Sequence, residues 1–251
     1  MKTYNYKSFL IQILYEDEQL AILNKPAALL THKKSINDEE PSLCESLKSY
    51  FDITDDEPFK EGIVHRLDRL TSGIIIIAKN SSIKSKLQEL FKKREINKFY
   101  ITYVIGNFLD KEKNISGNIS RQNKQRTKFK MSDEKGKDSL TIVNHKETFY
   151  GSISLLECEI ITGRTHQIRV HLSNLGFPLI GDRDYRKNLE QKFMLKNLPN
   201  KVKVIVDNFS RQALHSFKIN FIHPVTNELI DIECPLPDDL QYLDKVLRNG
   251  R

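Results

Sequence analysis

An unbroken apolar run at residues 74–78, Ile-Ile-Ile-Ile-Ala, is the feature that most constrains the fold of this chain. A run this rich in β-branched residues predicts a buried strand. The nine residues before it, at 65–73, are polar and end in a small-residue turn. Loops at the ends of buried strands hold many catalytic side chains, because the strand fixes them while the loop exposes them. Asp68 is therefore the first candidate for chemistry, although a turn or an ion pair with Arg66 or Arg69 would explain an isolated Arg-x-Asp equally well.

Length and composition predict one large globular domain over residues 1–251. The chain is 39% hydrophobic and 29% charged, and it has neither an apolar stretch long enough to span a membrane nor a charged leader followed by an apolar segment. We therefore expect a cytoplasmic protein that does not associate with a membrane. The three cysteines, Cys44, Cys158 and Cys234, lie far apart without a Cys-x-x-Cys pair, which argues against a disulfide framework and a structural zinc site. We expect them to be buried as small hydrophobic residues.

The charge balance favours a polyanionic partner. The formal net charge is +7, and basic residues gather at 84–98 and at 121–130. One such cluster alone would indicate only a solvated helix face, with the lysines opposite the apolar stripe. Two clusters near a candidate site favour nucleic acid.

Strand and helix signals are intermixed without regular alternation, which predicts an α+β fold. Polar turns between apolar runs predict hairpins at 11–26 and near the C-terminus, and residues 107–146 read as short strands and exposed loops. The remaining expected elements are helices at 43–50 and after the capping residues 80–82, strands at 99–105 and 153–161, and a helix after 165 that ends at Gly176 and Pro178.

A second dense polar segment, residues 163–171, carries Arg169 at the edge of an apolar helix stripe. An arginine there could pair with a carboxylate or phosphate through its planar guanidinium, or could lie on the surface and cover the helix with its stem. His166 and His171 are five residues apart and lack a nearby acidic or cysteine ligand, so we expect no metal site. The chain contains no nucleophile elbow, phosphate loop or Gly-x-Gly-x-x-Gly motif, so no nucleotide cofactor is expected.

In these motifs the chain resembles the RluA-type RNA pseudouridine synthases. Residues 65–73 match the catalytic motif of that family, Lys98-Phe99-Tyr100 matches its Lys-x-Tyr motif, and residues 163–171 match its third motif, in the same order. Further similarity extends from Asn24-Lys25-Pro26 through Gly181-Asp182 and the segment 211–215 to Pro235-Leu236-Pro237. The resemblance implies a mixed, largely antiparallel central sheet flanked by helices and loops around an RNA-binding cleft.

The resemblance also implies a reaction, in which uracil is detached from ribose, turned and rejoined through carbon 5 without a cofactor. Asp68 would attack either the ribose or the uracil ring, and Arg169 would keep that carboxylate ionised in a desolvated pocket. Tyr100 would stack on the uracil and could accept the carbon-5 proton, while Arg66 would help to fill the gap left by the flipped nucleotide. The same motifs assign His65, Arg164, His166 and Gln167 to substrate binding.

The chain departs from the family pattern at several positions. Ala28 stands where a glycine usually follows the Asn-Lys-Pro hairpin, so the local turn could differ. Leu70 replaces an acidic residue, and Arg186 replaces a glycine after Tyr185, before a polar segment that extends to 208. Too few residues precede the first hairpin for the N-terminal RNA-binding module of many relatives. We expect a monomer that acts on ribosomal or transfer RNA without an obligate protein partner.

Two other functions are compatible with parts of the pattern. A catalytically idle RNA-binding module would be expected to lack the aspartate or the tyrosine, yet Asp68, Tyr100 and Arg169 are all present. A hydrolytic enzyme such as an RNA glycosidase or nuclease would need a second carboxylate or a metal set near Asp68, and the sequence indicates neither. The isomerase is therefore the favoured hypothesis.

Overall fold

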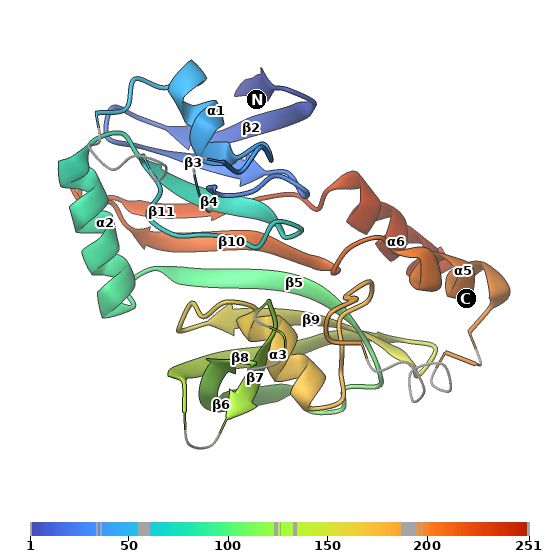
Figure 1. Ribbon diagram of the computed structural model, residues 1–251. Helices are drawn as coiled ribbons and strands as arrows, with labels where there is room; N and C mark the ends of the chain where they lie inside the picture. Colours follow the sequence, from blue (N-terminus) through green and yellow to red (C-terminus); the bar gives the residue numbers. More distant parts are fainter. Residues whose placement is uncertain are drawn as a thin grey trace. The chain divides into compact units, whose positions relative to one another are not determined.

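The chain folds into two compact units in the computed structural model. The structure describes residues 2–33, 35, 37–54, 61–122, 125, 127–132, 135–186, 195–196 and 198–249. The first unit comprises Met1–Lys98 and Ser216–Pro235, and the second comprises Phe99–His215 and Leu236–Arg251 (Figure 1). The expectation of a single catalytic domain over residues 1–251 stays a prediction.

The first unit contains a sheet built from hairpins. Its strands follow the order β1, β2, β3, β4 and β10, and β11 pairs with β10. The pairs β1–β2, β2–β3, β3–β4 and β10–β11 are antiparallel, which confirms the two predicted hairpins. The elements are β1 (Lys2–Tyr6), β2 (Phe9–Glu16), β3 (Leu20–Lys25), α1 (Leu43–Tyr50), β4 (Ser72–Ala78), α2 (Ser81–Lys93), β10 (Leu214–Ile222) and β11 (Leu229–Glu233).

β4 is buried at every residue, as the isoleucine run predicts. Ile75 and Ile77 belong to an apolar cluster that includes residues of α1, whereas Ile74 and Ile76 belong to another that includes residues of α2. Successive side chains of a strand point to opposite faces of the sheet. Because each face of β4 packs in its own apolar cluster, the strand shows no alternation with polar residues.

Local sequence sets the ends of α1 and α2. α1 begins with a capping box, in which the Ser42 hydroxyl accepts a hydrogen bond from the Glu45 amide at 3.3 Å and the Glu45 carboxylate accepts one from the Ser42 amide at 3.2 Å. At the start of α2, the Asn80 side chain accepts a hydrogen bond from the Ile83 amide at 2.9 Å. α2 ends at Arg94, which has a left-handed φ of 63°. Both helices were expected from the sequence.

The second unit contains an antiparallel sheet with the strand order β5, β9, β8, β6 and β7. The helix α3 packs against β6, β7 and β8. β6 and β8 are longer than the short strands expected between residues 107 and 146, and Lys124 and Arg126 of the second basic segment lie outside the described residues. The elements are β5 (Asn97–Ile105), β6 (Glu112–Arg121), β7 (Phe129–Ser132), β8 (Lys137–Phe149), β9 (Ile153–Ile160), α3 (Gln167–Asn174), α5 (Asn200–Asn208) and α6 (Asp238–Asn249).

The helices α5 and α6 complete the core of the second unit, and neither was predicted from the sequence. Val202 and Val206 of α5 pack in one apolar cluster with Leu240 and Leu243 of α6. The same cluster includes Phe149 at the end of β8. Part of the polar segment before α5, residues 187–194 and 197, lies outside the described residues.

The basic segment at 84–98 is not uniformly exposed, which corrects the expectation that its lysines lie opposite the apolar stripe of α2. Lys84 is 5% exposed and Lys98 is 6% exposed. Lys84 follows the buried Ile83, so its aliphatic stem continues the buried side of the helix. The other basic residues of the segment are exposed, namely Lys86, Lys92, Lys93 and Arg94.

The three cysteines are buried and free of disulfides, as predicted for small hydrophobic residues. In the ranges that the structure describes, no helix is both long enough and apolar enough to cross a membrane.

Candidate active site

The loop that carries Asp68 is held in place by main-chain hydrogen bonds. The Thr31 hydroxyl donates to the Leu67 carbonyl at 2.9 Å and accepts from the Leu67 amide at 3.2 Å. After Asp68, its carbonyl accepts a hydrogen bond from the Thr71 amide at 3.0 Å, which forms a tight turn into β4. The loop is therefore fixed on both sides of Asp68, whose side chain is half-buried.

A buried lysine adds a third restraint on this loop. Lys25, at the end of β3, is fully buried and donates to the carbonyl oxygens of Pro26, Leu29 and Arg69 at 2.9, 2.8 and 3.3 Å. The ammonium group therefore links the turn after β3 to the residue that follows Asp68. The Arg69 side chain pairs with Glu40, with 2.7 Å between Nε and Oε2.

His65 lies at the start of the loop and faces β4. Its Nε2 accepts a hydrogen bond from the Ile76 amide at 2.8 Å, and its ring lies 4.8 Å from the ring of Phe91. Burial, with a smaller contribution from the charge of Lys98, lowers the pKa of His65 to about 3. The neutral imidazole accepts a main-chain hydrogen bond from β4 and so attaches the start of the loop to that strand. The expected role of His65 in substrate binding stays a prediction. Arg66 is exposed.

Tyr100 lies on β5 in the second unit, where it is the register partner of Cys158 on β9. It is 6% exposed. Lys98 lies two residues earlier on the same strand, with its Nζ 5.4 Å from the centre of the Phe91 ring. The Lys-x-Tyr pattern therefore places both side chains on the same face of β5, since alternate residues of a strand share a face.

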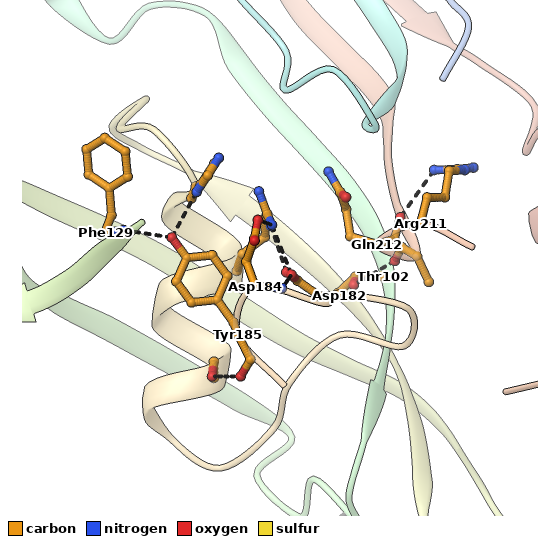
Figure 2. Close-up of polar contacts among 11 residues, drawn as sticks. Thr102, Phe129, Asp182, Asp184, Tyr185, Arg211 and Gln212 are labelled. Carbon is orange, nitrogen blue, oxygen red and sulfur yellow. Dashed lines mark hydrogen bonds and ion pairs between the residues drawn. The ribbon is translucent and has the colours of Figure 1, made fainter. Parts of the chain in front are cut away.

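Arg169 lies on α3 and is only 5% exposed, so the interpretation of a surface arginine that covers the helix is wrong. Its Nε and Nη2 donate to the two carboxylate oxygens of Asp182 at 2.7 and 2.9 Å. Nη2 also donates to Asp184 at 2.8 Å (Figure 2). Asp182 is 1% exposed, whereas the Asp184 side chain is 47% exposed. The arginine thus pairs with one buried and one exposed carboxylate.

Tyr185 connects α3 to β7. Its hydroxyl accepts a hydrogen bond from the Phe129 amide at 2.9 Å and lies 2.8 Å from His166 Nδ1 (Figure 2). Its ring lies under the guanidinium of Arg169, with Cζ 5.0 Å from the ring centre. Burial raises the pKa of Tyr185 to about 12, so the hydroxyl remains protonated. His166 itself has a left-handed φ of 58° and is the N-cap residue of α3, although its side chain makes no capping hydrogen bond to the helix.

Gln167 directs all its side-chain hydrogen bonds inward. Its amide nitrogen donates to the Leu140 carbonyl at 3.0 Å and to the Thr141 hydroxyl at 2.9 Å. Its carbonyl oxygen accepts from the Thr162 hydroxyl at 2.7 Å and from the Arg164 amide at 3.0 Å. The Arg164 side chain donates to a main-chain carbonyl of β8 at 2.8 Å. These bonds fix the turn before α3, and contact of either side chain with RNA stays a prediction.

The structure assigns the predicted site residues to two units. His65, Arg66 and Asp68 belong to the first unit, and the second contains Tyr100, Arg164, His166, Gln167 and Arg169. Sequence reasoning assigned no role to Lys25, Asp182 or Tyr185. All three lie in or next to segments that carry the family resemblance, but spacing along the chain does not identify their partners.

Comparison with known proteins identifies the family. A family model described as RNA pseudouridylate synthase matches residues 19–174. The chain is 34% identical over 238 residues to ribosomal large subunit pseudouridine synthase D of Xylella fastidiosa, covering 95% of this chain and 70% of that protein. It is 33% identical over 237 residues to an uncharacterized RNA pseudouridine synthase of Bacillus subtilis, covering 93% of this chain and 71% of that protein.

A solved structure, titled human RNA Pseudouridylate Synthase Domain Containing 4, has a TM-score of 0.70 at 22% identity and covers 94% of this chain and 92% of that chain. The structure titled human RNA Pseudouridylate Synthase Domain Containing 1 has a TM-score of 0.67 at 24% identity, with 95% of both chains covered. These similarities confirm the α+β fold with a mostly antiparallel sheet. The chain therefore belongs to the RluA-type family of RNA pseudouridine synthases, which are RNA-modifying isomerases.

Proposed function

We propose that this enzyme isomerises uridines of large-subunit ribosomal RNA and that Asp68 is its catalytic aspartate. The choice of RNA is supported by relatives named ribosomal large subunit pseudouridine synthase D, such as the Xylella fastidiosa protein with 34% identity. The choice of Asp68 rests chiefly on the loop at 65–73, which matches the family's catalytic motif and is fixed on both sides of the carboxylate. A catalytic group must be held within about 0.5 Å of its productive position, and the hydrogen bonds on both sides of Asp68 support the proposal because they restrain the loop.

The chemistry requires no outside oxidant, reductant or group donor. The bond between ribose carbon 1′ and uracil nitrogen 1 breaks, a bond between carbon 1′ and carbon 5 forms, carbon 5 loses its proton and nitrogen 1 gains one. Asp68, as a carboxylate, is able to add to the ribose or to the uracil ring, and both routes lead to this balance. Tyr100 stacks on the uracil and accepts the carbon-5 proton.

The remaining predicted residues have supporting roles in this proposal. Arg66, which is exposed, helps to fill the space that the flipped nucleotide leaves in the RNA. Arg169 offers guanidinium N–H donors from a buried position, and Arg164 and His166 contact the RNA near the start of α3. His65 and Gln167 act by holding their loops, because their side chains bond to the main chain of β4 and β8. We expect the enzyme to work in the cytoplasm as a monomer.

The proposal is tested by mapping pseudouridine in ribosomal and transfer RNA from a strain that lacks the gene. We expect specific positions of large-subunit RNA to lose pseudouridine and to regain it when the wild-type gene is supplied. Asp68→Asn keeps the size of the side chain but removes the charge, and we expect it to restore nothing. Glu40→Gln is the matched control, since it removes the partner of the neighbouring Arg69 and leaves Asp68 in place.

The outcomes separate the two parts of the proposal. Loss of pseudouridine only in transfer RNA would overturn the assignment of ribosomal RNA but not of Asp68. Full restoration by Asp68→Asn at normal protein level would overturn the assignment of Asp68. If no position in either RNA changed, the assignment of both substrates would be wrong.

A further inference from the structure

We propose that Asp182 is a positioning residue for Arg169: it fixes the direction in which the buried guanidinium presents its hydrogen-bond donors during the reaction. This inference rests on the catalytic role proposed for Arg169. The role concerns orientation, because Asp182 acts on the uridine only through the arginine.

The geometry of the pair fixes the plane of the guanidinium. Two parallel hydrogen bonds, at 2.7 Å from Nε and 2.9 Å from Nη2, prevent rotation of the group within its plane. Nη1 takes no part in these two bonds or in the bond to Asp184. The pair thus uses one edge of the guanidinium and sets where the other edge points.

Asp182 is itself placed by its main chain and not by the arginine alone. Gly181, with φ of 73°, comes so close to the main chain of Arg211 that a Cβ at this position would lie 1.9 Å from the Arg211 carbonyl oxygen. The Asp182 amide donates to the Leu179 carbonyl at 3.2 Å, and one carboxylate oxygen of Asp182 accepts from the Asp184 amide at 3.0 Å. A carboxylate held this way can impose its position on a partner.

Tyr185 restrains the guanidinium from a different direction. Its ring lies 5.0 Å from Cζ of Arg169, and its hydroxyl is held by the Phe129 amide (Figure 2). The Ser173 hydroxyl donates to the Tyr185 carbonyl at 2.8 Å, which fixes the main chain of the tyrosine against α3. Asp182 therefore holds one edge of the guanidinium, while the central carbon of the group lies over the Tyr185 ring.

The second unit provides a matched control in another buried arginine. Arg211 is 4% exposed and makes the same bidentate pair with Asp239, at 2.6 and 2.8 Å. No proposed catalytic residue takes part in that pair. Asp239→Asn therefore reproduces the loss of a bidentate carboxylate without acting on Arg169.

The experiment compares purified Asp182→Asn, Asp182→Glu, Asp184→Asn and Asp239→Asn with the wild type. The readout is tritium release from total RNA labelled at carbon 5 of uridine, taken from a strain without the gene, because isomerisation replaces the C5–H bond in any target RNA. Each kcat is normalised to folded protein and measured well below the melting temperature of the variant.

We expect Asp182→Asn to lower kcat by about 10- to 100-fold with KM nearly unchanged, because a displacement of about 1 Å can reduce a rate about 100-fold. Asp182→Glu keeps the charge but moves the carboxylate, so it should also lower kcat by about tenfold or more. Asp184→Asn should have a smaller effect than Asp182→Asn. Asp239→Asn should stay within about threefold of the wild type, because Asp239 pairs with Arg211 and not with Arg169.

A double variant separates positioning from a merely structural role. If Asp182 acts only through Arg169, Asp182→Asn should slow Arg169→Lys by no more than about threefold. The inference would be overturned if the two substitutions lowered kcat in the double variant by the product of their separate effects. It would also be overturned if folded Asp182→Asn and Asp182→Glu kept a kcat within threefold of the wild type. Tritium release from transfer RNA alone would contradict the proposed substrate while leaving this comparison valid.

Discussion

Replacing Ala28 by glycine should reveal strain in the turn after β3, which Lys25 links to the Asp68 loop. The family resemblance leads us to expect glycine at position 28, and the φ of Ala28, 68°, lies in the left-handed region that glycine favours. Holding a residue with a Cβ in that region costs about 1–2 kcal/mol. The absence of the glycine has therefore left the turn in a conformation suited to glycine, at the expense of stability.

The adjacent Ala27 makes the magnitude measurable, because it is also half-buried but has no positive φ. At either position, replacing alanine by glycine lowers the free energy of unfolding in two ways. The loss of half a buried methyl group lowers it by about 0.4 kcal/mol, and the larger entropy of the unfolded chain lowers it by about 0.4–1 kcal/mol. Ala27→Gly should therefore destabilise by about 1 kcal/mol, whereas the relief of strain should leave Ala28→Gly unchanged or more stable by about 1 kcal/mol.

Urea denaturation at constant pH measures the difference between the two variants, in which the shared terms cancel. We expect the free energy of unfolding of Ala28→Gly to exceed that of Ala27→Gly by about 1–2 kcal/mol. Equal destabilisation by both substitutions would refute the reasoning, since it would show that Ala28 carries no conformational penalty.

Two further predictions concern buried ionisable groups. Burial lowers the pKa of His65 to about 3 and that of His171 to about 4, below the value near 6.5 in the unfolded chain, so the unfolded state binds more protons as pH falls below 6.5. Between pH 7.5 and pH 5, we expect each histidine to reduce the free energy of unfolding by about 2 kcal/mol. In urea titrations, His65→Gln should remove the part of this pH dependence that His65 causes. An unchanged pH dependence in that variant would contradict the prediction. Lys25→Met should leave three main-chain carbonyls without their ammonium donor and lower the free energy of unfolding by about 1–3 kcal/mol. It should also speed hydrogen exchange of the Thr71 amide. Unaltered exchange would show that the lysine does not hold the loop.

Short sequence patterns predicted the elements whose structure depends on residues close to one another along the chain. The isoleucine run, the Asn80 cap and the polar turns of the hairpins each depend on neighbours along the chain, and the structure confirms them. α6 also carried a usable signal, since Leu240, Leu243 and Leu247 recur at helical spacing after a proline and are buried. The sequence therefore contained enough local information to predict α6.

The burial of cations could not be predicted in the same way. Lys25 and Lys84 look like ordinary surface lysines in sequence, because what buries them is decided by segments that meet only in the folded chain. Lys25 is stabilised by carbonyls from the turn after β3 and from the Asp68 loop, where Arg69 is 44 residues away from the lysine along the chain. Composition counts such residues as surface charge, and so overstates the charge available for binding RNA.

The partners of Arg169 bear on the role that the family resemblance implies for it. A lone guanidinium would supply positive charge to keep a nearby carboxylate ionised, but this one already binds two carboxylates, Asp182 and Asp184, within its own unit. These two carboxylates offset part of its charge before any substrate arrives. The bidentate pair also orients the group, because the surrounding carboxylates fix the plane in which the guanidinium N–H donors lie. We expect Arg169→Lys to lose this geometry, because an ammonium group cannot supply a planar pair of donors at equal charge.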